Sequence, residues 1–166
     1  MEKTPPPIDK AALLHAMVAQ LEAQLETLLR SAEAAHASAT HADARAENQY
    51  DTRGLEAGYL AQAQAGRAEK LRAELAELRL LKPRRWRPDE PAAVGALLAL
   101  ADDRDAEGLY FLSPGRGLVV QLGKRAIQVL AAGSPLGREL HGKGAGDEVE
   151  LEVRGEARGY EIRRVW

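Results

Sequence analysis

The sequence of 166 residues contains no cysteine, and aromatic residues make up only 4% of it. The absence of cysteine excludes a disulfide-stapled scaffold and a cysteine-ligated zinc site. So few aromatic side chains argue against a base-stacking surface for single-stranded nucleic acid. The formal net charge is −2, so the chain has no overall basic field, and we expect no direct sequence-specific DNA binding.

The chain also lacks long apolar runs. No stretch approaches the roughly 18 consecutive apolar residues of a transmembrane helix, and the opening MEKTPPPIDK has no apolar segment of a secretory signal. We therefore expect no membrane association and a cytoplasmic location. The prolines predict a disordered leader over residues 1–8, and Asp9 is the predicted N-cap of a first helix.

Two apolar rows with the 4-3 spacing of a coiled-coil seam dominate residues 9–82. The first row begins with bulky residues and continues in small ones: Leu14, Val18, Leu21, Leu25, Leu28, Ala32, Ala35, Ala39 and Ala42. The second row has the opposite order: Ala57, Ala61, Gln64, Ala68, Leu71, Leu75 and Leu78. Leucine meets leucine only if the rows run antiparallel. The sequence thus predicts an α-helical coiled-coil hairpin with its tip near residues 43–56.

Lys82-Pro83 is predicted to end the second helix, because the residue before a proline avoids helical geometry. Residues 83–91 are expected to be a linker, and two interpretations of it stay open. It is either a stiff, solvated connector, or a segment whose Trp86 packs on a domain edge. In the second case, an acidic partner surface would meet Arg84, Arg85 and Arg87.

From residue 92 the apolar period changes from that of a helix to that of strands. Apolar segments between turn residues predict strands at 94–100, 108–112, 118–122, 127–130, 149–153 and 160–166. Ser134-Pro135 predicts one helical turn that ends at Gly142, with Ser as N-cap and Pro at the first helical position. The predicted fold class is α+β: the antiparallel helical hairpin, then a small, mostly antiparallel sheet domain over residues 92–166.

The stretch SPLGRELHGK (134–143), followed by Gly146-Asp147-Glu148-Val149, resembles the C-terminal signature of the bacterial GreA/GreB transcript-cleavage factors. ENQYDTRGLEA (47–57) is similar to the tip of that family's coiled coil. The resemblance implies an FKBP-like C-terminal domain without peptidyl-prolyl isomerase activity. It also implies that the hairpin enters the secondary channel of RNA polymerase while the domain holds the channel rim. We expect a monomer that acts as an accessory factor and not as an enzyme, because no Ser-His-Asp or Cys-His set is present.

Three carboxylates near the expected tip are candidates for assisting cleavage of backtracked RNA: Asp43, Glu47 and Asp51. On a helix they would share one face, and hard cations such as Mg²⁺ take oxygen ligands. Asp43 and Glu47 are the candidate ligands for a Mg²⁺ ion shared with the polymerase, and we expect no stably bound cofactor. The family carries an Asp and a Glu three apart just before the Asn, whereas these two are four apart. A polymerase modulator or inhibitor without cleavage therefore stays open, as does a plain solvated acidic face.

The candidate polymerase-binding residues lie on the predicted helical turn and its exit. A surface turn supported by a rigid sheet is a typical place for recognition residues. They are Ser134, Pro135, Leu136, Gly137, Arg138, Leu140 and Lys143. A third interpretation, from a different class, is a non-transcriptional coiled-coil interaction protein with an unrelated adaptor domain.

Overall fold

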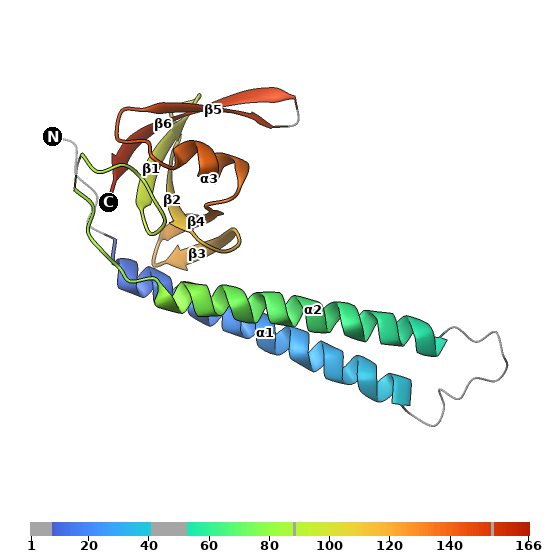
Figure 1. The fold of residues 1–166 in the computed structure, drawn as a ribbon. Helices are drawn as coiled ribbons and strands as arrows, with labels where there is room; N and C mark the ends of the chain where they lie inside the picture. Colours follow the sequence, from blue (N-terminus) through green and yellow to red (C-terminus); the bar gives the residue numbers. More distant parts are fainter. Residues whose placement is uncertain (1–7, 41–52, 88, 154) are drawn as a thin grey trace. The chain divides into compact units, whose positions relative to one another are not determined.

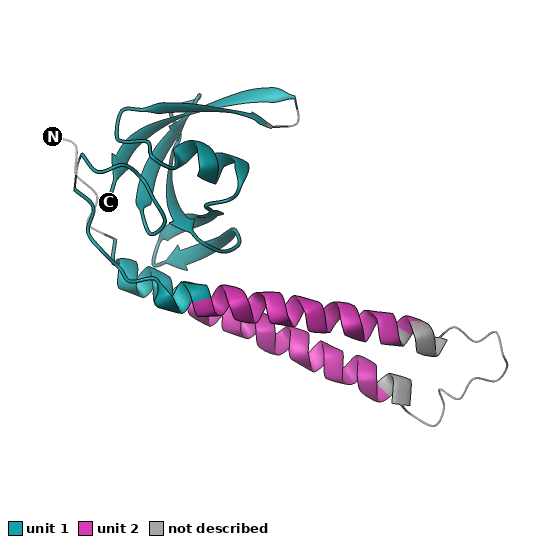
Figure 2. Cartoon of the chain, in the orientation of Figure 1, with its two compact units in different colours: residues 1–17, 77–166 teal, residues 18–76 magenta. Residues whose placement is uncertain are grey.

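The computed structural model describes residues 8–40, 53–87, 89–153 and 155–166 (Figure 1). Two long helices come first, followed by six strands with one short helix between the fourth and the fifth. The chain separates into two compact units (Figure 2). Unit 1 combines residues 1–17 with residues 77–166, and unit 2 is residues 18–76. Unit 1 is thus built from segments far apart in the sequence.

Helix α1 spans Lys10–Thr40 and helix α2 spans Arg53–Leu80. The Oδ1 atom of Asp9 accepts hydrogen bonds from the backbone N–H of Ala11 at 2.9 Å and of Ala12 at 3.2 Å. This confirms the predicted N-cap, which satisfies donors that have no partner inside the helix. Helix α2 ends just before Lys82-Pro83, as predicted. The predicted hairpin turn lies outside the described residues.

Within unit 2, burial follows the predicted 4-3 rows. The members of the rows that are at most 3% exposed there are Leu21, Ala68, Leu71 and Leu75. Gln64, which is 9% exposed, stands in the same row as a polar residue. Its Nε2 donates to the Oγ of Ser31 at 3.3 Å, whereas its Oε1 has no hydrogen-bond partner. A polar residue inside a seam fixes the register of the two helices at a cost in stability.

Unit 1 contains one six-stranded sheet with the strand order β3-β4-β2-β1-β6-β5. The strands are β1 Leu97–Asp102, β2 Glu107–Ser113, β3 Leu118–Leu122, β4 Arg125–Ala131, β5 Glu148–Val153 and β6 Glu156–Val165. The predicted, mostly antiparallel sheet is confirmed, but β2 and β4 pair in parallel, with Leu109 opposite Ile127. The first strand begins at Leu97 and not at 94, because Gly95 turns the chain with a φ of 91°. Among the described helices, none has the length and apolar character needed to cross a membrane.

The core of unit 1 joins the sheet to the short helix α3, Pro135–Leu140. Its fully buried members, at most 1% exposed, include Leu98, Leu100, Leu112, Leu140 and Ile162. Trp86, only 8% exposed, belongs to the same cluster. This agrees with the interpretation in which Trp86 packs on the domain.

Candidate docking surface at helix α3

Helix α3 is a short helix that local hydrogen bonds hold at both ends. Ser134 is its N-cap, and its Oγ accepts from the backbone N–H of Gly137 at 3.1 Å. Pro135 takes the first helical position, where a missing N–H leaves no hydrogen bond unmade. At the other end, the N–H of His141 donates to the carbonyl of Gly137 at 3.1 Å. The Ser-Pro pair therefore sets the start of this helix, as predicted.

Gly137 lies where α3 approaches the preceding chain most closely. A Cβ atom added there would lie 2.2 Å from the carbonyl oxygen of Ala131 and 3.0 Å from the Cα of Ala132. Such distances leave room only for glycine. Leu140, on the same helix, is 0% exposed and lies in the core. Neither residue presents a side chain to solvent, so these two candidate contact residues support the turn and do not face outward.

The outer side of α3 carries the remaining candidates. Pro135 and Arg138 are exposed, Ser134 is half-buried, and the half-buried Leu136 also packs against the core of unit 1. The Nη1 of Arg138 donates to the carbonyl of Gly133 at 2.8 Å, which orients the guanidinium along the turn. The surface thus combines an apolar rim with a positioned cation.

The exit of α3 is fixed to the start of the sheet domain. The N–H of Gly142 donates to the carbonyl of Ala92 at 2.8 Å, and the N–H of Ala92 donates to the carbonyl of Lys143 at 2.7 Å. The side chain of Lys143 is exposed next to this pair of bonds. A carboxylate oxygen of Asp147 accepts from the N–H of Gly144 at 2.7 Å and closes the following turn. Lys143 is therefore presented from a rigid backbone, as a recognition residue requires.

Binding of a protein partner at α3 stays a prediction. In the described parts of the chain, no group of three or more His, Cys, Asp or Glu residues could hold a metal ion. The candidate tip residues Asp43, Glu47 and Asp51 lie outside the described residues. The proposed role of these carboxylates at a Mg²⁺ ion therefore stays a prediction.

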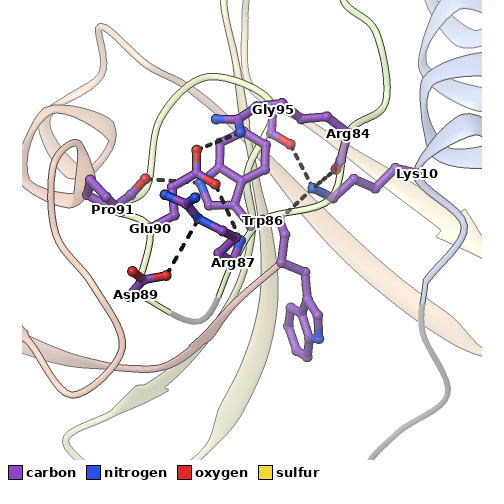
Figure 3. Close-up of polar contacts among 9 residues, drawn as sticks. Lys10, Arg84, Trp86, Arg87, Asp89, Glu90, Pro91 and Gly95 are labelled. Carbon is purple, nitrogen blue, oxygen red and sulfur yellow. Dashed lines mark hydrogen bonds and ion pairs between the residues drawn. The ribbon is translucent and has the colours of Figure 1, made fainter.

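Sequence reasoning missed a polar cluster around Trp86 in unit 1 (Figure 3). The Nζ of Lys10 donates to three main-chain oxygens, those of Arg84 at 2.9 Å, Gly95 at 3.2 Å and Trp166 at 2.5 Å. The same ammonium lies 4.4 Å from the ring centroid of Trp86, and the Arg84 guanidinium lies 3.4 Å from it. Burial, followed by the charge of Arg84, lowers the pKa of Lys10 to about 8. No sequence pattern pointed to a lysine in the first helical turn.

In the segment after α2, arginine side chains form ion pairs with carboxylates of the same segment. The Nη1 of Arg84 pairs with Glu90 at 2.5 Å, and the Nε of Arg87 lies 3.7 Å from the carboxylate of Asp89. The hydrogen bond from Arg84 lowers the pKa of the Glu90 carboxyl below its usual value. The indole N–H of Trp86 donates to the carbonyl of Pro91 at 3.0 Å. Arg84 and Arg87 thus have acidic partners within the segment itself.

No protein-family model matches this chain. Among curated proteins, the transcription elongation factor GreA of Chelativorans sp. (strain BNC1) is 39% identical to it over 72 residues, which is 43% of this chain and 43% of that GreA. The sequence resemblance to the Gre factors is confirmed. Over that stretch the chain is similar to GreA, and the stretch spans less than half the length of that relative.

Similar solved structures include Gfh1, the GreA factor homolog 1, of Thermus thermophilus and Thermus aquaticus. The first is 19% identical, with 90% of this chain and 94% of that chain covered and a TM-score of 0.36. The second is 17% identical, with 89% and 92% covered and a TM-score of 0.39. Likenesses this weak carry no conclusion about function.

Proposed function

We propose that this Gre-like chain is an accessory factor of RNA polymerase, which uses its helical hairpin as a probe of the secondary channel. The observation that carries the proposal is the 39% identity to the elongation factor GreA over 72 residues. Two further features support it. The paired rows of α1 and α2 make a hairpin, and the Ser-Pro cap of α3 supplies a rigid recognition turn.

In this proposal the outer side of α3 binds the channel rim. The contact residues are the exposed Pro135, Arg138 and Lys143, together with the half-buried Leu136. Gly137 and Leu140 act indirectly, because they hold the turn on the core. The factor has no reaction of its own and acts on the polymerase active site.

The carboxylates Asp43, Glu47 and Asp51 are proposed to work at the tip of the probe. Asp43 and Glu47 would hold a Mg²⁺ ion jointly with the polymerase, because carboxylate oxygens are the ligands this ion takes in proteins. A metal ion at such a site supplies an activated water for phosphodiester hydrolysis. The consequence is cleavage of backtracked RNA.

One observation favours a second candidate function. Asp43 and Glu47 are four residues apart, whereas the resemblance to cleavage factors would call for three. A factor with this spacing could dock in the same way and modulate or inhibit the polymerase without stimulating cleavage.

The docking half of the proposal is tested with Arg138→Glu. Reversing the charge of a side chain positioned on the rim-binding turn should weaken binding to RNA polymerase by tenfold or more, which is about 1.4 kcal/mol. The matched control is Arg104→Glu, since Arg104 is also exposed but lies in the turn between β1 and β2. Equal affinities for the two variants, both with native circular dichroism, would remove α3 from the proposal.

The tip half is tested with the double variant Asp43→Asn, Glu47→Gln on a backtracked elongation complex across a Mg²⁺ titration. If the carboxylates assist cleavage, the variant should lose the effect on transcription and keep its polymerase affinity. A wild type that lowers elongation without releasing cleaved RNA would support the modulator instead. Equal activity of both proteins at every Mg²⁺ concentration would leave the tip without a role in cleavage.

A further inference from the structure

A cavity of about 690 Å³ opens in unit 1 beside the polar cluster around Trp86 (Figure 3). Two segments far apart in the sequence line it, the start of α1 and the segment after α2, together with Trp166. Small-molecule sites in proteins have volumes of roughly 300–1,000 Å³. The cavity is therefore large enough for a ligand with two fused rings.

The walls of the cavity are mainly apolar and include both tryptophans of the chain. Trp86 is buried, whereas Trp166 and Ile8 are half-buried and Pro83 is exposed. Aromatic rings pack favourably against an indole ring, either stacked with an offset or edge to face. These walls suit a ligand with an aromatic body.

Three cationic side chains also line the cavity: Lys10, Arg84 and Arg85. Arg84 has a partner, because its Nη1 pairs with the Glu90 carboxylate at 2.5 Å. Arg85 is exposed, and it belongs to none of the ion pairs that join described residues. The carboxylate in the lining is that of Asp9, whose Oδ1 accepts N–H groups at the start of α1. The described lining therefore has an excess of positive charge.

The ammonium of Lys10 shows the effect of this excess. It donates to three main-chain oxygens, so it supplies charge to the cavity but has no N–H left for a ligand. Burial, followed by the charge of Arg84, lowers the pKa of Lys10 to about 8, and the opposing effect of Glu90 is smaller. A nearby negative group favours the charged form of a lysine. An anion in the cavity would therefore be stabilised by Lys10 without contacting it.

Arg85 is the residue that can bind such an anion directly. A guanidinium presents its N–H donors in a planar fork that matches the oxygens of a carboxylate or a phosphate. We propose that the cavity binds a small aromatic anion, whose rings pack against Trp166 and Ile8 and whose carboxylate or phosphate pairs with Arg85. The site involves neither α3 nor the hairpin tip, so the proposal does not depend on the proposed function.

The test titrates the whole chain with three probes that share one naphthalene body, using isothermal titration calorimetry. They are 1-naphthoate, 1-naphthyl phosphate and the neutral 1-naphthalenemethanol. A hydrogen-bonded ion pair is worth enough for a change in affinity of about tenfold. We expect at least one of the two anions to bind about tenfold more tightly than the neutral probe. Tight binding of only one anion would support the site and identify the anionic group that it accepts.

The two indole N–H signals in a proton–nitrogen NMR spectrum report where the probe binds. Both tryptophans line the cavity and the chain has no others, so both signals should shift when an anion is added. Lys10 gives a second readout, because the bound anion should raise the pKa of its ammonium above about 8.

Two variants assign the anionic group to Arg85. Arg85→Gln should weaken the anion that binds by about tenfold and leave the neutral probe within about threefold of its affinity for wild type. The matched control is Arg87→Gln, since Arg87 is also exposed but lies outside the lining and 3.7 Å from the Asp89 carboxylate. It should bind every probe as the wild type does.

Three results would overturn the proposal. The first is that neither anion binds at millimolar concentration, and the second is that the neutral probe binds as tightly as both anions. The third is an equal loss of anion affinity in Arg85→Gln and Arg87→Gln, because it would reduce the effect to the general charge of the segment.

Discussion

Replacing Gly137 with alanine tests the close approach of α3 to the chain before it. The added Cβ would lie 2.2 Å from the carbonyl oxygen of Ala131, where real contacts are at least 3.0 Å. Backbone lines this site, so the helix or the preceding turn must shift. Overpacking of this kind costs about 1–3 kcal/mol, and the better helix propensity of alanine returns at most about 1 kcal/mol. We expect a net loss of about 1–2 kcal/mol of unfolding free energy.

The same substitution at Gly66 is the matched control. Gly66 lies inside α2, and a Cβ atom there would meet nothing within 4 Å. Glycine inside a helix costs about 0.5–1 kcal/mol relative to alanine. Gly66→Ala should therefore stabilise the protein by about that amount, so one chemical change is expected to have opposite signs at two sites.

The two units offer separate signals in urea denaturation. Both tryptophans of the chain, Trp86 and Trp166, belong to unit 1, so their fluorescence reports its unfolding. Circular dichroism at 222 nm is dominated by the two long helices. Gly137→Ala should lower the fluorescence midpoint, and Gly66→Ala should raise the circular dichroism midpoint. A Gly137→Ala protein as stable as wild type would refute the tight approach at α3.

Two further predictions concern single polar side chains. Gln64→Leu should stabilise the hairpin by about 1 kcal/mol, because it removes a buried, unpartnered Oε1; a lower melting temperature would mean that the bond to Ser31 outweighs that cost. The pKa of Lys10 is lowered from 10.5 to about 8 in the folded chain, so the unfolded chain binds more protons between these values. The unfolding free energy of wild type minus that of Lys10→Met should therefore rise from pH 8 to pH 10.5. A fall in this difference would show that the hydrogen bonds from Lys10 to the three main-chain oxygens raise its pKa instead.

The sequence predicted those parts of the fold that local patterns determine. The 4-3 rows place one side chain in the seam at each turn of helix, so Leu71 and Leu75 could be assigned without any knowledge of the partner helix. The Ser134 cap acts within three residues, so it too is visible in the sequence. Both are confirmed because each depends on neighbours that are close in the chain.

Features that depend on distant contacts could not be predicted. The parallel pairing of β2 with β4 requires β3 to be placed outside both strands, which no local signal specifies. Leu13 and Met17 are 0% exposed although they lie outside the predicted seam, because the start of α1 belongs to unit 1 and buries a wider arc there. Leu140 was expected at the surface, but one turn of helix does not show from its sequence which side faces the core.

The contribution of both chain segments to unit 1 has a consequence for synthesis on the ribosome. Lys10 binds the main-chain oxygen of Trp166, and β1 pairs with β6, so unit 1 cannot close until the last of these residues has left the exit tunnel. The helices of unit 2 emerge earlier, and domains generally fold as units while the chain is being made. Until unit 1 folds, the first two turns of α1 therefore expose the apolar side chains of Leu13 and Met17, which are buried in the folded chain. A nascent chain stalled before β6 should therefore expose this segment to proteases and chaperones.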